Sequence, residues 1–415
     1  MKRIINKIRA ILSFLSLYGQ HLPLAIWSIF SIRCKVILIR GRVKKSQHNI
    51  DIMYVGRMQN FEYIRQQLLD SSEIVNQVNS TLLTYKTHAN KTHPKSDAVV
   101  MDFGWPYHYK FNTQDEFLEL PDWINMMTDT TGKISEVIAK FRKTTRANDL
   151  RWIRKYSYSY DLVNDNESID YFYDQMYTPF VKNTHGAGAI LAKKKEIAKR
   201  VKQGSLLRIH YQGQVLAAGV IYPEDNVLYF LWMGMLPELP PEACNSNLDK
   251  RLPDGVISAL YYYGIEYANK EGMDAADFTG TRGILSDGTF HFKRKWGAIV
   301  EDTFSPSSIL LKLNSRSKNS LAFTKSTPLI IRNTQGLEIR VVVDDLTSLN
   351  ENEMFEAIWK QHGCKGIESI CVIHVNDKLP EVIQELDFNG ISCYWIQSHL
   401  DSFDLAYCKD YSKGS

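Results

Sequence analysis

The sequence is poor in cysteine and has no close cysteine pairs. Six cysteines are distributed over 415 residues, which gives neither the CxxC pairing of a zinc site nor the density of a secreted disulfide scaffold. No cysteine or serine lies in a recognisable triad setting. We expect reduced, mostly buried thiols in a cytosolic protein. The cysteines are Cys34, Cys244, Cys364, Cys371, Cys393 and Cys408.

A strong excess of one charge is also missing. The formal net charge is +4, with 44% hydrophobic and 23% charged residues, so the composition describes a globular chain of two or three domains and gives no general case for DNA binding. The polar segment Thr84–Asp97 contains His88 and His93. Without a third ligand at a useful spacing, solvent exposure is favoured and no metal is predicted.

The first 46 residues form a segment of their own. Basic residues flank an uncharged stretch, Ala10–Ile32, and the preceding residues have the pattern of an amphipathic helix with a cationic side. Gly19 and Pro23 interrupt the stretch, and no small-residue cleavage site precedes Arg33. The pattern leaves three interpretations: residues 1–45 lie on a membrane surface, pack as helices on the protein, or span the bilayer. In each, the body of the protein stays cytoplasmic, at most peripheral at the inner face of the membrane.

The densest cluster of signals runs from Tyr263 to Ala298. The spacing predicts a helix over Ala259–Lys270, a short strand over Ala275–Thr279, and a turn at Gly280–Gly283 whose backbone N–H groups can face an anion. After Asp287-Gly288, three cations follow His291, interleaved with aromatic residues. This pattern indicates either a solvated face or a cationic face toward a cleft that holds a phosphate or carboxylate.

A second cationic concentration lies on a predicted helix, Ser135–Tyr156. Arg142 and Arg146 lie four residues apart and hence on one face, and arginine grips phosphate through two parallel hydrogen bonds. The following residues predict a strand, a helix, a loop with His185 and an antiparallel meander. These are Tyr158–Leu162, Ile169–Val181, Lys182–Gly188, and the strands Leu206–Tyr211, Gln214–Tyr222 and Val227–Met235.

Together, KFRKTTRANDLRWIRK, FYDQMYTPFVKNTHG, LLRIHYQGQVLAAGVIY, EYANKEGMDAADFTG and DGTFHFKRKWGA resemble the GNAT-like acyltransferases related to the Fem aminoacyltransferases, including acetyltransferase-like proteins of polysaccharide biosynthesis. The resemblance covers roughly Ala98–Phe304. It implies an α/β (α+β) fold with a mixed central sheet and flanking helices. The sheet is splayed so that an acyl donor lies in a cleft and an amine approaches from the other side.

The resemblance implies acyl-CoA, such as acetyl-CoA, as donor, and an amine acceptor. The sequence departs from the better-known GNAT pattern because no basic-xxGxG/A pyrophosphate loop follows the meander. An aminoacyl-tRNA donor, as in the Fem enzymes, therefore stays open as the alternative, and tRNA is a partner only in that case.

An imidazole is the group expected to remove the proton from the amine, and His291 and His185 are the candidates. Asp277 or Asp287 is expected to orient the imidazole or to contact the amine. The predicted catalytic residues are His291 and Asp277, with a strand-edge side chain and a turn cap as their ordinary structural roles. Substrate binding is assigned to Arg142, Arg146, Tyr177, His185, Arg282, Lys293 and Arg294.

Beyond the resemblance, the C-terminal part predicts a polar linker, 314–326, and a small parallel α/β domain, 327–415. The domain has no glycine fingerprint or phosphate loop, which favours partner binding or structural support. The GNAT-like domain is placed at 47–313. The expected elements are strands Leu337–Val343, Ser369–Val375 and Ile391–Gln397, and helices Asn352–Gln361 and Pro380–Leu386.

The sequence thus predicts an acyltransferase. Its expected reaction is N-acyl (acetyl) transfer from acyl-CoA to an amino sugar or similar amine in cell-surface polysaccharide or envelope biosynthesis. The alternatives are aminoacyl-tRNA-dependent transfer to a cell-wall precursor, and a non-catalytic scaffold with a transferase fold.

Overall fold

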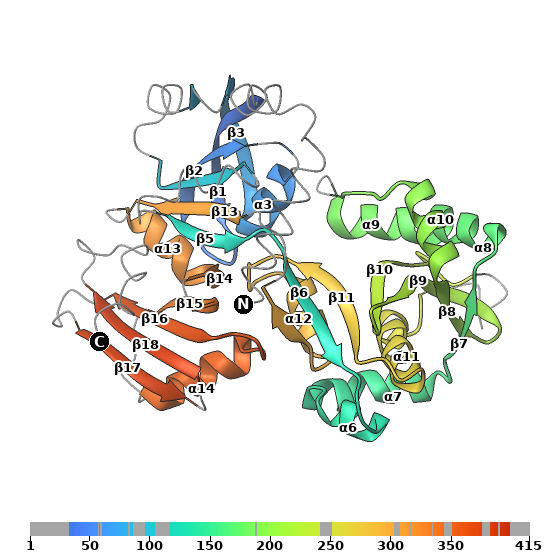
Figure 1. Cartoon of the computed structure of the whole chain (residues 1–415). Helices are drawn as coiled ribbons and strands as arrows, with labels where there is room; N and C mark the ends of the chain where they lie inside the picture. The colour runs from blue at the N-terminus through green and yellow to red at the C-terminus, as the bar shows by residue number, and fades with distance from the viewer. Residues whose placement is uncertain are drawn as a thin grey trace, which may run out of the picture. The chain divides into compact units, whose positions relative to one another are not determined.

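The structure is a computed structural model of the whole chain (Figure 1). It describes residues 33–398, except 57, 59, 82–83, 86–95, 104–116, 187–188, 241–250, 303–307, 315–316, 334, 344–350, 376–381 and 389–390. The predictions for residues 1–32 lie outside the described residues, as do His88 and His93. The chain forms two compact units. Unit 1 comprises Met1–Ile124, Arg282–Asp287 and Asp302–Ser415, and unit 2 comprises Asn125–Thr281 and Gly288–Glu301.

Unit 1 contains a six-stranded sheet in the order β3-β1-β2-β4-β13-β5 within the described residues. Strand β1, Arg33–Val43, lies within the N-terminal segment of 46 residues that was predicted to be a separate part of the chain. Helix α3, Phe61–Leu68, packs Phe61, Ile64 and Leu68 into the core. The strands are β1 Arg33–Val43, β2 Asn49–Gly56, β3 Leu69–Thr81, β4 Ala98–Asp102, β5 Leu118–Pro121 and β13 Ser308–Leu313.

The C-terminal part of unit 1 forms a five-stranded sheet, β14-β15-β16-β18-β17, with helix α14, Glu351–His362. β15, β16 and β18 are parallel, as predicted, and the two edge strands pair antiparallel. The predicted helix Pro380–Leu386 is wrong, because Val382–Phe388 is strand β17. The strands are β14 Leu329–Arg332, β15 Leu337–Val343, β16 Ser369–Val375, β17 Val382–Phe388 and β18 Ile391–Ser398.

These two sheets of unit 1 share one hydrophobic core, in which Phe61 and Leu120 belong to the same cluster as Phe323, Ile331 and Ile373. The predicted linker contains helix α13, Lys318–Ser326, which begins at a Ser317 cap. Arg332 of β14 reinforces the junction by donating to Asp302, Glu119 and Ser308.

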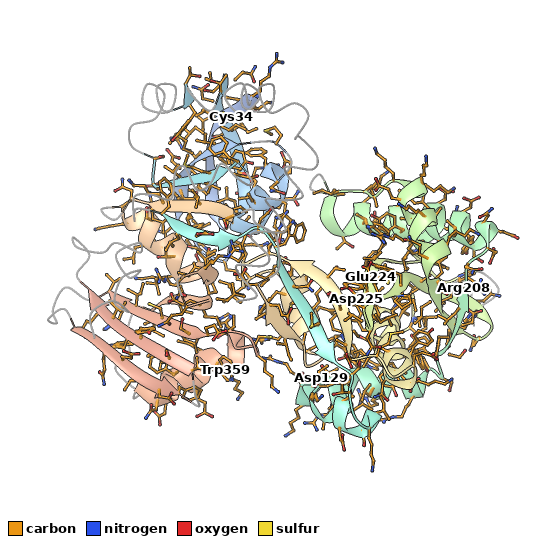
Figure 2. The ribbon with its side chains drawn as sticks, in the orientation of Figure 1. Cys34, Asp129, Arg208, Glu224, Asp225 and Trp359 are labelled. Atoms are coloured by element: carbon orange, nitrogen blue, oxygen red, sulfur yellow. The ribbon has the colours of Figure 1, made fainter. Side chains whose placement is uncertain are left out.

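Unit 2 is built on a mixed seven-stranded sheet in the order β12-β6-β11-β10-β9-β8-β7 within the described residues. The meander β8-β9-β10 is antiparallel, as predicted. Asp225 and Asn226 join β9 and β10 with φ of 50° and 62°, as a tight hairpin turn requires; Glu224 and Asp225 are labelled in Figure 2. The strands are β6 Ile124–Asp129, β7 Ser159–Val163, β8 Ser205–Tyr211, β9 Gln214–Glu224, β10 Val227–Met235, β11 Ala275–Thr281 and β12 Ile299–Glu301.

Helices flank this sheet, so the predicted mixed central sheet with flanking helices is confirmed. On one face, Tyr261 of α11 packs on Phe230 and Phe278 with ring centroids 6.0 and 4.7 Å apart. The helical segments are α6 Ile134–Ala139, η1 Thr145–Asp149, α7 Leu150–Lys155, α8 Asn166–Tyr171, η2 Phe172–Tyr177, α9 Thr178–His185, α10 Lys194–Gln203, α11 Val256–Lys270 and α12 Gly288–Arg294, of which η1 and η2 are π-helical.

The continuous helix predicted for Ser135–Tyr156 is wrong, since the chain leaves helical geometry between α6 and η1. At this break Phe141 packs edge-on against Trp296, with centroids 5.3 Å apart. The Arg142 N–H donates to the Lys295 carbonyl at 2.9 Å. Burial of Phe141 and this tertiary hydrogen bond outweigh the helical pattern.

Candidate active site

The unit 2 sheet splits between its two central strands. β10 and β11 are parallel and pair only over Val227–Tyr229 and Ala275–Asp277, although β10 continues to Met235 and β11 to Thr281. On its other side β10 has a bulge between Phe230 and Met233, and bulges bend a strand. The splayed sheet that the family resemblance implies is therefore present.

A glycine allows a helix to approach the diverging part of β10. A Cβ atom at Gly234 would lie 2.6 Å from the Cα of Tyr177, which no side chain tolerates. The π-helical segment η2 therefore packs directly on the strand, and π-helical turns are frequent at functional sites.

Asp277 lies at the point of divergence, in register with Tyr229. Its side chain is 2% exposed; Asn125 of β6 donates to one carboxylate oxygen, and the Thr279 N–H donates to the other at 2.6 Å. Burial raises the pKa of Asp277, while the hydrogen bonds from Asn125 and Thr279 and the charge of Lys293 oppose that rise. A buried carboxylate whose pKa is raised is a candidate for proton transfer.

Thr279 follows with a φ of 63°, which is costly for a β-branched residue and is typical of functional sites. Lys293 of α12 reaches this turn and donates to the carbonyls of Thr279 and Gly280 at 3.2 and 2.8 Å. The turn predicted at Gly280–Gly283 was expected to present backbone N–H groups to an anion. Instead β11 continues to Thr281, and two carbonyls face an ammonium group.

The residues after Asp287-Gly288 form helix α12. His291 is half-buried, and its ring lies 5.8 Å from that of Phe290. Lys293 and Arg294 are 4% and 5% exposed, so they do not form a solvated cationic face. The catalytic role of His291 and the anion-binding roles of these two cations stay predictions.

Arg142 and Arg146 keep their spacing, because the Arg146 N–H donates to the Arg142 carbonyl at 3.0 Å. Arg142 is half-buried and Arg146 exposed. Beside them, Asp149 of η1 accepts from Lys295 at 2.8 Å and from Ser258 at 2.5 Å. This buried network joins the segment after α12 to η1 and α11.

The structure gives Tyr177 a local partner. Its hydroxyl accepts a hydrogen bond from the Ala192 N–H at 2.9 Å, and the side chain is 3% exposed. His185 is the last residue of α9 rather than part of a loop, and its side chain is outside the described residues.

Arg282 and Asp287 belong to unit 1 rather than to the split sheet. The Arg282 guanidinium lies 3.7 Å from the ring centre of Trp123 and donates to Asn60 and to the Asp122 carbonyl, both at 2.7 Å. Burial lowers the pKa of Arg282 to about 10. Asp287 accepts from the Tyr63 hydroxyl at 2.5 Å.

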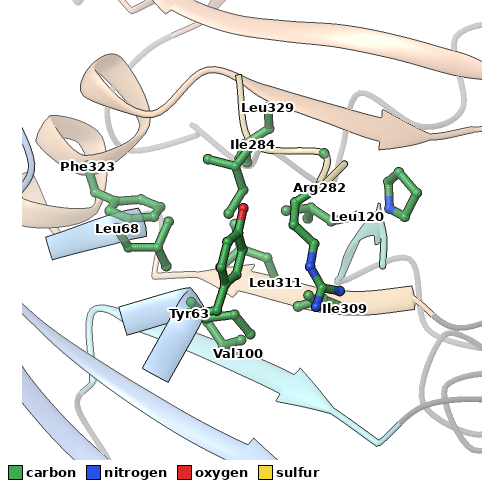
Figure 3. A pocket seen from close by; sticks show the side chains of 13 residues that line it. Tyr63, Leu68, Val100, Leu120, Arg282, Ile284, Ile309, Leu311, Phe323 and Leu329 are labelled. Atoms are coloured by element: carbon green, nitrogen blue, oxygen red, sulfur yellow. The ribbon is translucent and has the colours of Figure 1, made fainter. Parts of the chain in front are cut away.

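Arg282 and Tyr63 also line a cavity in unit 1 (Figure 3). Its volume is about 20 Å³ and its other walls are mostly aliphatic, so it holds no more than a small group. The remaining wall residues are Ile64, Leu68, Val100, Leu120, Pro121, Gly283, Ile284, Ile309, Leu311, Phe323 and Leu329.

Asp277, a predicted catalytic residue, lies beside Asn125, Tyr229 and Thr279, which no sequence pattern singled out, and its catalytic role stays a prediction. Only strand pairing brings Asn125 and Tyr229 beside Asp277, and neither has a local motif. Thr279 was predicted as the last residue of the strand Ala275–Thr279, and its side-chain type gives no indication of a positive φ.

No cluster of three or more His, Cys, Asp or Glu side chains suited to a metal occurs in the described part of the chain. Among the described cysteines, Cys34, Cys364, Cys371 and Cys393 are free and buried. Within the same residues, no helix is both long and apolar enough to cross a bilayer.

No protein-family model matches the sequence, and no curated protein matches it either. Among solved structures, the chain is similar to FemX, with 12% identity, a TM-score of 0.35, and coverage of 67% of this chain and 84% of that chain. A lysylphosphatidylglycerol synthetase-type C-terminal domain from Agrobacterium fabrum gives 10% identity, a TM-score of 0.32, and coverage of 68% and 86%. An Enterococcus faecalis protein of unknown function, suggested to be an N-acyltransferase, gives 7%, 0.27, and 75% and 64%.

Proposed function

We propose that this chain is an acyltransferase that moves an acyl group from acyl-CoA, such as acetyl-CoA, to the amine of an amino sugar or a similar acceptor in cell-surface polysaccharide or envelope biosynthesis. The observation that carries the proposal is the split between β10 and β11 beside buried Asp277. Past Tyr229 the two strands no longer pair with each other, and backbone groups at such an edge need partners. An extended arm with amide groups, as in pantetheine, fits this edge like an added strand.

The chemistry requires three contributions from the site. The cleft holds amine and thioester together, N–H groups of β10 polarise the thioester carbonyl, and a base removes the amine proton. The amine nitrogen bonds to the acyl carbon, the C–S bond breaks, and the thiolate leaves with a proton. Asp277 is the first candidate for the base because it lies at the split, and His291 is the second.

An aminoacyl-tRNA donor is the alternative. It is favoured by four exposed basic side chains on η1 and α7, because a cationic surface attracts the phosphates of RNA. These are Arg146, Arg151, Arg154 and Lys155.

The donor is tested by calorimetric titration of the full chain with acetyl-CoA and with a long-chain acyl-CoA. We expect saturable binding of at least one, competed by free coenzyme A. If neither binds, the acyl-CoA proposal fails; binding of charged tRNA would then support the alternative, and binding of no donor would support a scaffold.

The base is tested with Asp277→Asn, using glucosamine as acceptor and release of free coenzyme A as readout. Loss of a general base costs about 10²-fold or more in kcat, with donor affinity retained. Asp161→Asn, at a carboxylate on β7 away from the split, is the matched control. Equal activity of the two variants would remove Asp277 from this role.

A further inference from the structure

The segment between α9 and α10 presents an apolar side chain to solvent. Ile190 is 55% exposed, and Leu191 beside it is half-buried. A single exposed apolar residue is ordinary on a protein surface. The surroundings of Ile190, however, are unusual in two respects.

First, hydrogen bonds hold the segment in place. The Ala192 N–H donates to the Tyr177 hydroxyl at 2.9 Å, and the Tyr173 hydroxyl donates to the Ala192 carbonyl at 3.3 Å. The Ala189 N–H donates to the Gly186 carbonyl at 3.2 Å. Ile190 therefore lies between two hydrogen-bonded residues, Ala189 and Ala192.

Second, the next helix has a cationic outer face. α10 buries Ile197 and Val201, whereas Lys195, Lys199 and Lys202 are exposed and follow one another at helical spacing. Lys193 is exposed just before the helix.

Lys195, Lys199 and Lys202 form a lysine stripe on α10, and few other charged groups face it. Lys194 lies to one side and pairs with Asp170 and Asp174 at 2.7 and 3.0 Å. Glu196 accepts from the Lys193 N–H at 3.4 Å, at the start of the helix, and Lys202 donates to the Asn164 carbonyl at 2.8 Å. The stripe itself therefore keeps its positive charge.

We propose that Ile190, Leu191 and the lysine stripe of α10 form a docking surface for an anionic lipid bilayer. Apolar side chains next to lysines match the boundary between acyl chains and acidic headgroups, and each lysine near such a surface strengthens binding about fivefold. Ile190 favours a bilayer over RNA, because an exposed aliphatic side chain gains little from a phosphate backbone. The surface lies wholly in unit 2.

The test is flotation of the full-length protein with vesicles of phosphatidylglycerol and phosphatidylcholine, compared with phosphatidylcholine alone. We expect binding only to the anionic vesicles, weakened by salt. Lys195→Glu with Lys199→Glu should weaken it at least about 20-fold, and Ile190→Ser severalfold.

The matched controls are Lys143→Glu with Lys270→Glu, two exposed lysines on other parts of unit 2, and Ile74→Ser, whose isoleucine is 47% exposed in unit 1. These controls should bind like the original protein, and all variants should keep its thermal midpoint. Unchanged vesicle binding after the Lys195 and Lys199 replacements overturns the proposal. So does binding of total tRNA through this stripe without vesicle binding. Acyl transfer measured in solution does not depend on vesicle binding, so failure of the docking proposal can be distinguished from failure of the proposed function.

Discussion

Thr279 is the residue where the candidate site stores backbone strain. A left-handed conformation costs a β-branched residue about 1–2 kcal/mol, and glycine relieves this at an entropic cost of about 0.5–1 kcal/mol. We expect Thr279→Gly to raise the free energy of unfolding by up to about 1 kcal/mol and to lower kcat, because the turn that orients Asp277 is loosened. Urea unfolding and the coenzyme A release assay measure the two effects.

Gln212 supplies the comparison. It has a φ of 50° in the turn between β8 and β9, so Gln212→Gly should give a similar gain in stability with unchanged kcat. If both variants affect turnover alike, the strain at Thr279 has no special relation to the site.

At this scale, the sequence predicted the strand that carries Asp277, because its apolar pattern is local. The catalytic role of Asp277 stays a prediction. The contacts of Lys293 could not be predicted, because its charge faces two carbonyls only once α12 packs against the end of β11.

Among the elements, β7 and β8 are joined by a cross-strand ion pair. Arg208, labelled in Figure 2, donates to both carboxylate oxygens of Asp161, at 2.8 and 2.5 Å. The hydrogen bond from Arg208, with help from His210, lowers the pKa of Asp161 to about 2 from an ordinary 3.8. Because the pKa is lowered in the folded protein, this stabilisation is present above about pH 4 and is lost as the pH falls toward 2.

Asp161→Asn should therefore lower stability near neutral pH and make little difference near pH 2. The urea midpoint measured between pH 2 and 7 shows this as two curves that converge at low pH. Parallel curves would mean that the pair does not couple proton binding to folding. Glu167→Gln, at an exposed carboxylate in the first turn of α8, controls for removal of one negative charge nearby.

Element types were predictable from periodicity where one face is buried, as in α11 and the meander. Periodicity predicted the wrong element type where tertiary contacts decide between helix and strand. In β17, half-buried and exposed residues alternate from Gln384 to Phe388, which is the pattern of a strand. β17 pairs with β18, and Asn389-Gly390 lies between the two strands in the sequence. This dipeptide is a hairpin signal, which the prediction of a helix did not take into account.

At the scale of the whole molecule, unit 1 depends on a core shared by distant parts of the chain. The Arg332 side chain is 13% exposed, and its partners Glu119 and Asp302 are 14% and 23% exposed. Arg332→Leu leaves these carboxylates uncompensated, and we expect a loss of about 3 kcal/mol in the free energy of unfolding. Arg332→Lys, which keeps the charge but not the forked geometry, should lose less. Equal losses would show that geometry, not charge, dominates.

Filling the cavity beside Arg282 should instead raise the stability of the protein. Val100 is 2% exposed and lines it, so Val100→Ile adds one methylene to an unfilled space. We expect stability to rise by about 0.5–1 kcal/mol, measured by thermal unfolding. Leu311→Val, which enlarges the same space, should have the reverse sign; a destabilising Val100→Ile would mean that the wall cannot accept the added group.

In the C-terminal part, the alternating pattern predicted β15, α14, β16 and β18 in their observed order, but not strands β14 and β17. The inclusion of this part in one core with the N-terminal sheet was not predictable, because the contacts join residues more than two hundred positions apart, such as Phe61 and Phe323. No local property of either segment specifies the other.

The brief pairing of β10 with β11 also sets a pattern of amide exchange with solvent deuterium. Up to Tyr229 the β10 amides have protein partners on both sides. After the bulge, β10 pairs with β9 again from Met233 to Met235, so alternate amides there point toward β9, while those between them point into the split and exchange faster. A bound donor that lies along this edge would slow only that second set, so deuterium uptake would record occupancy of the cleft before any product is known.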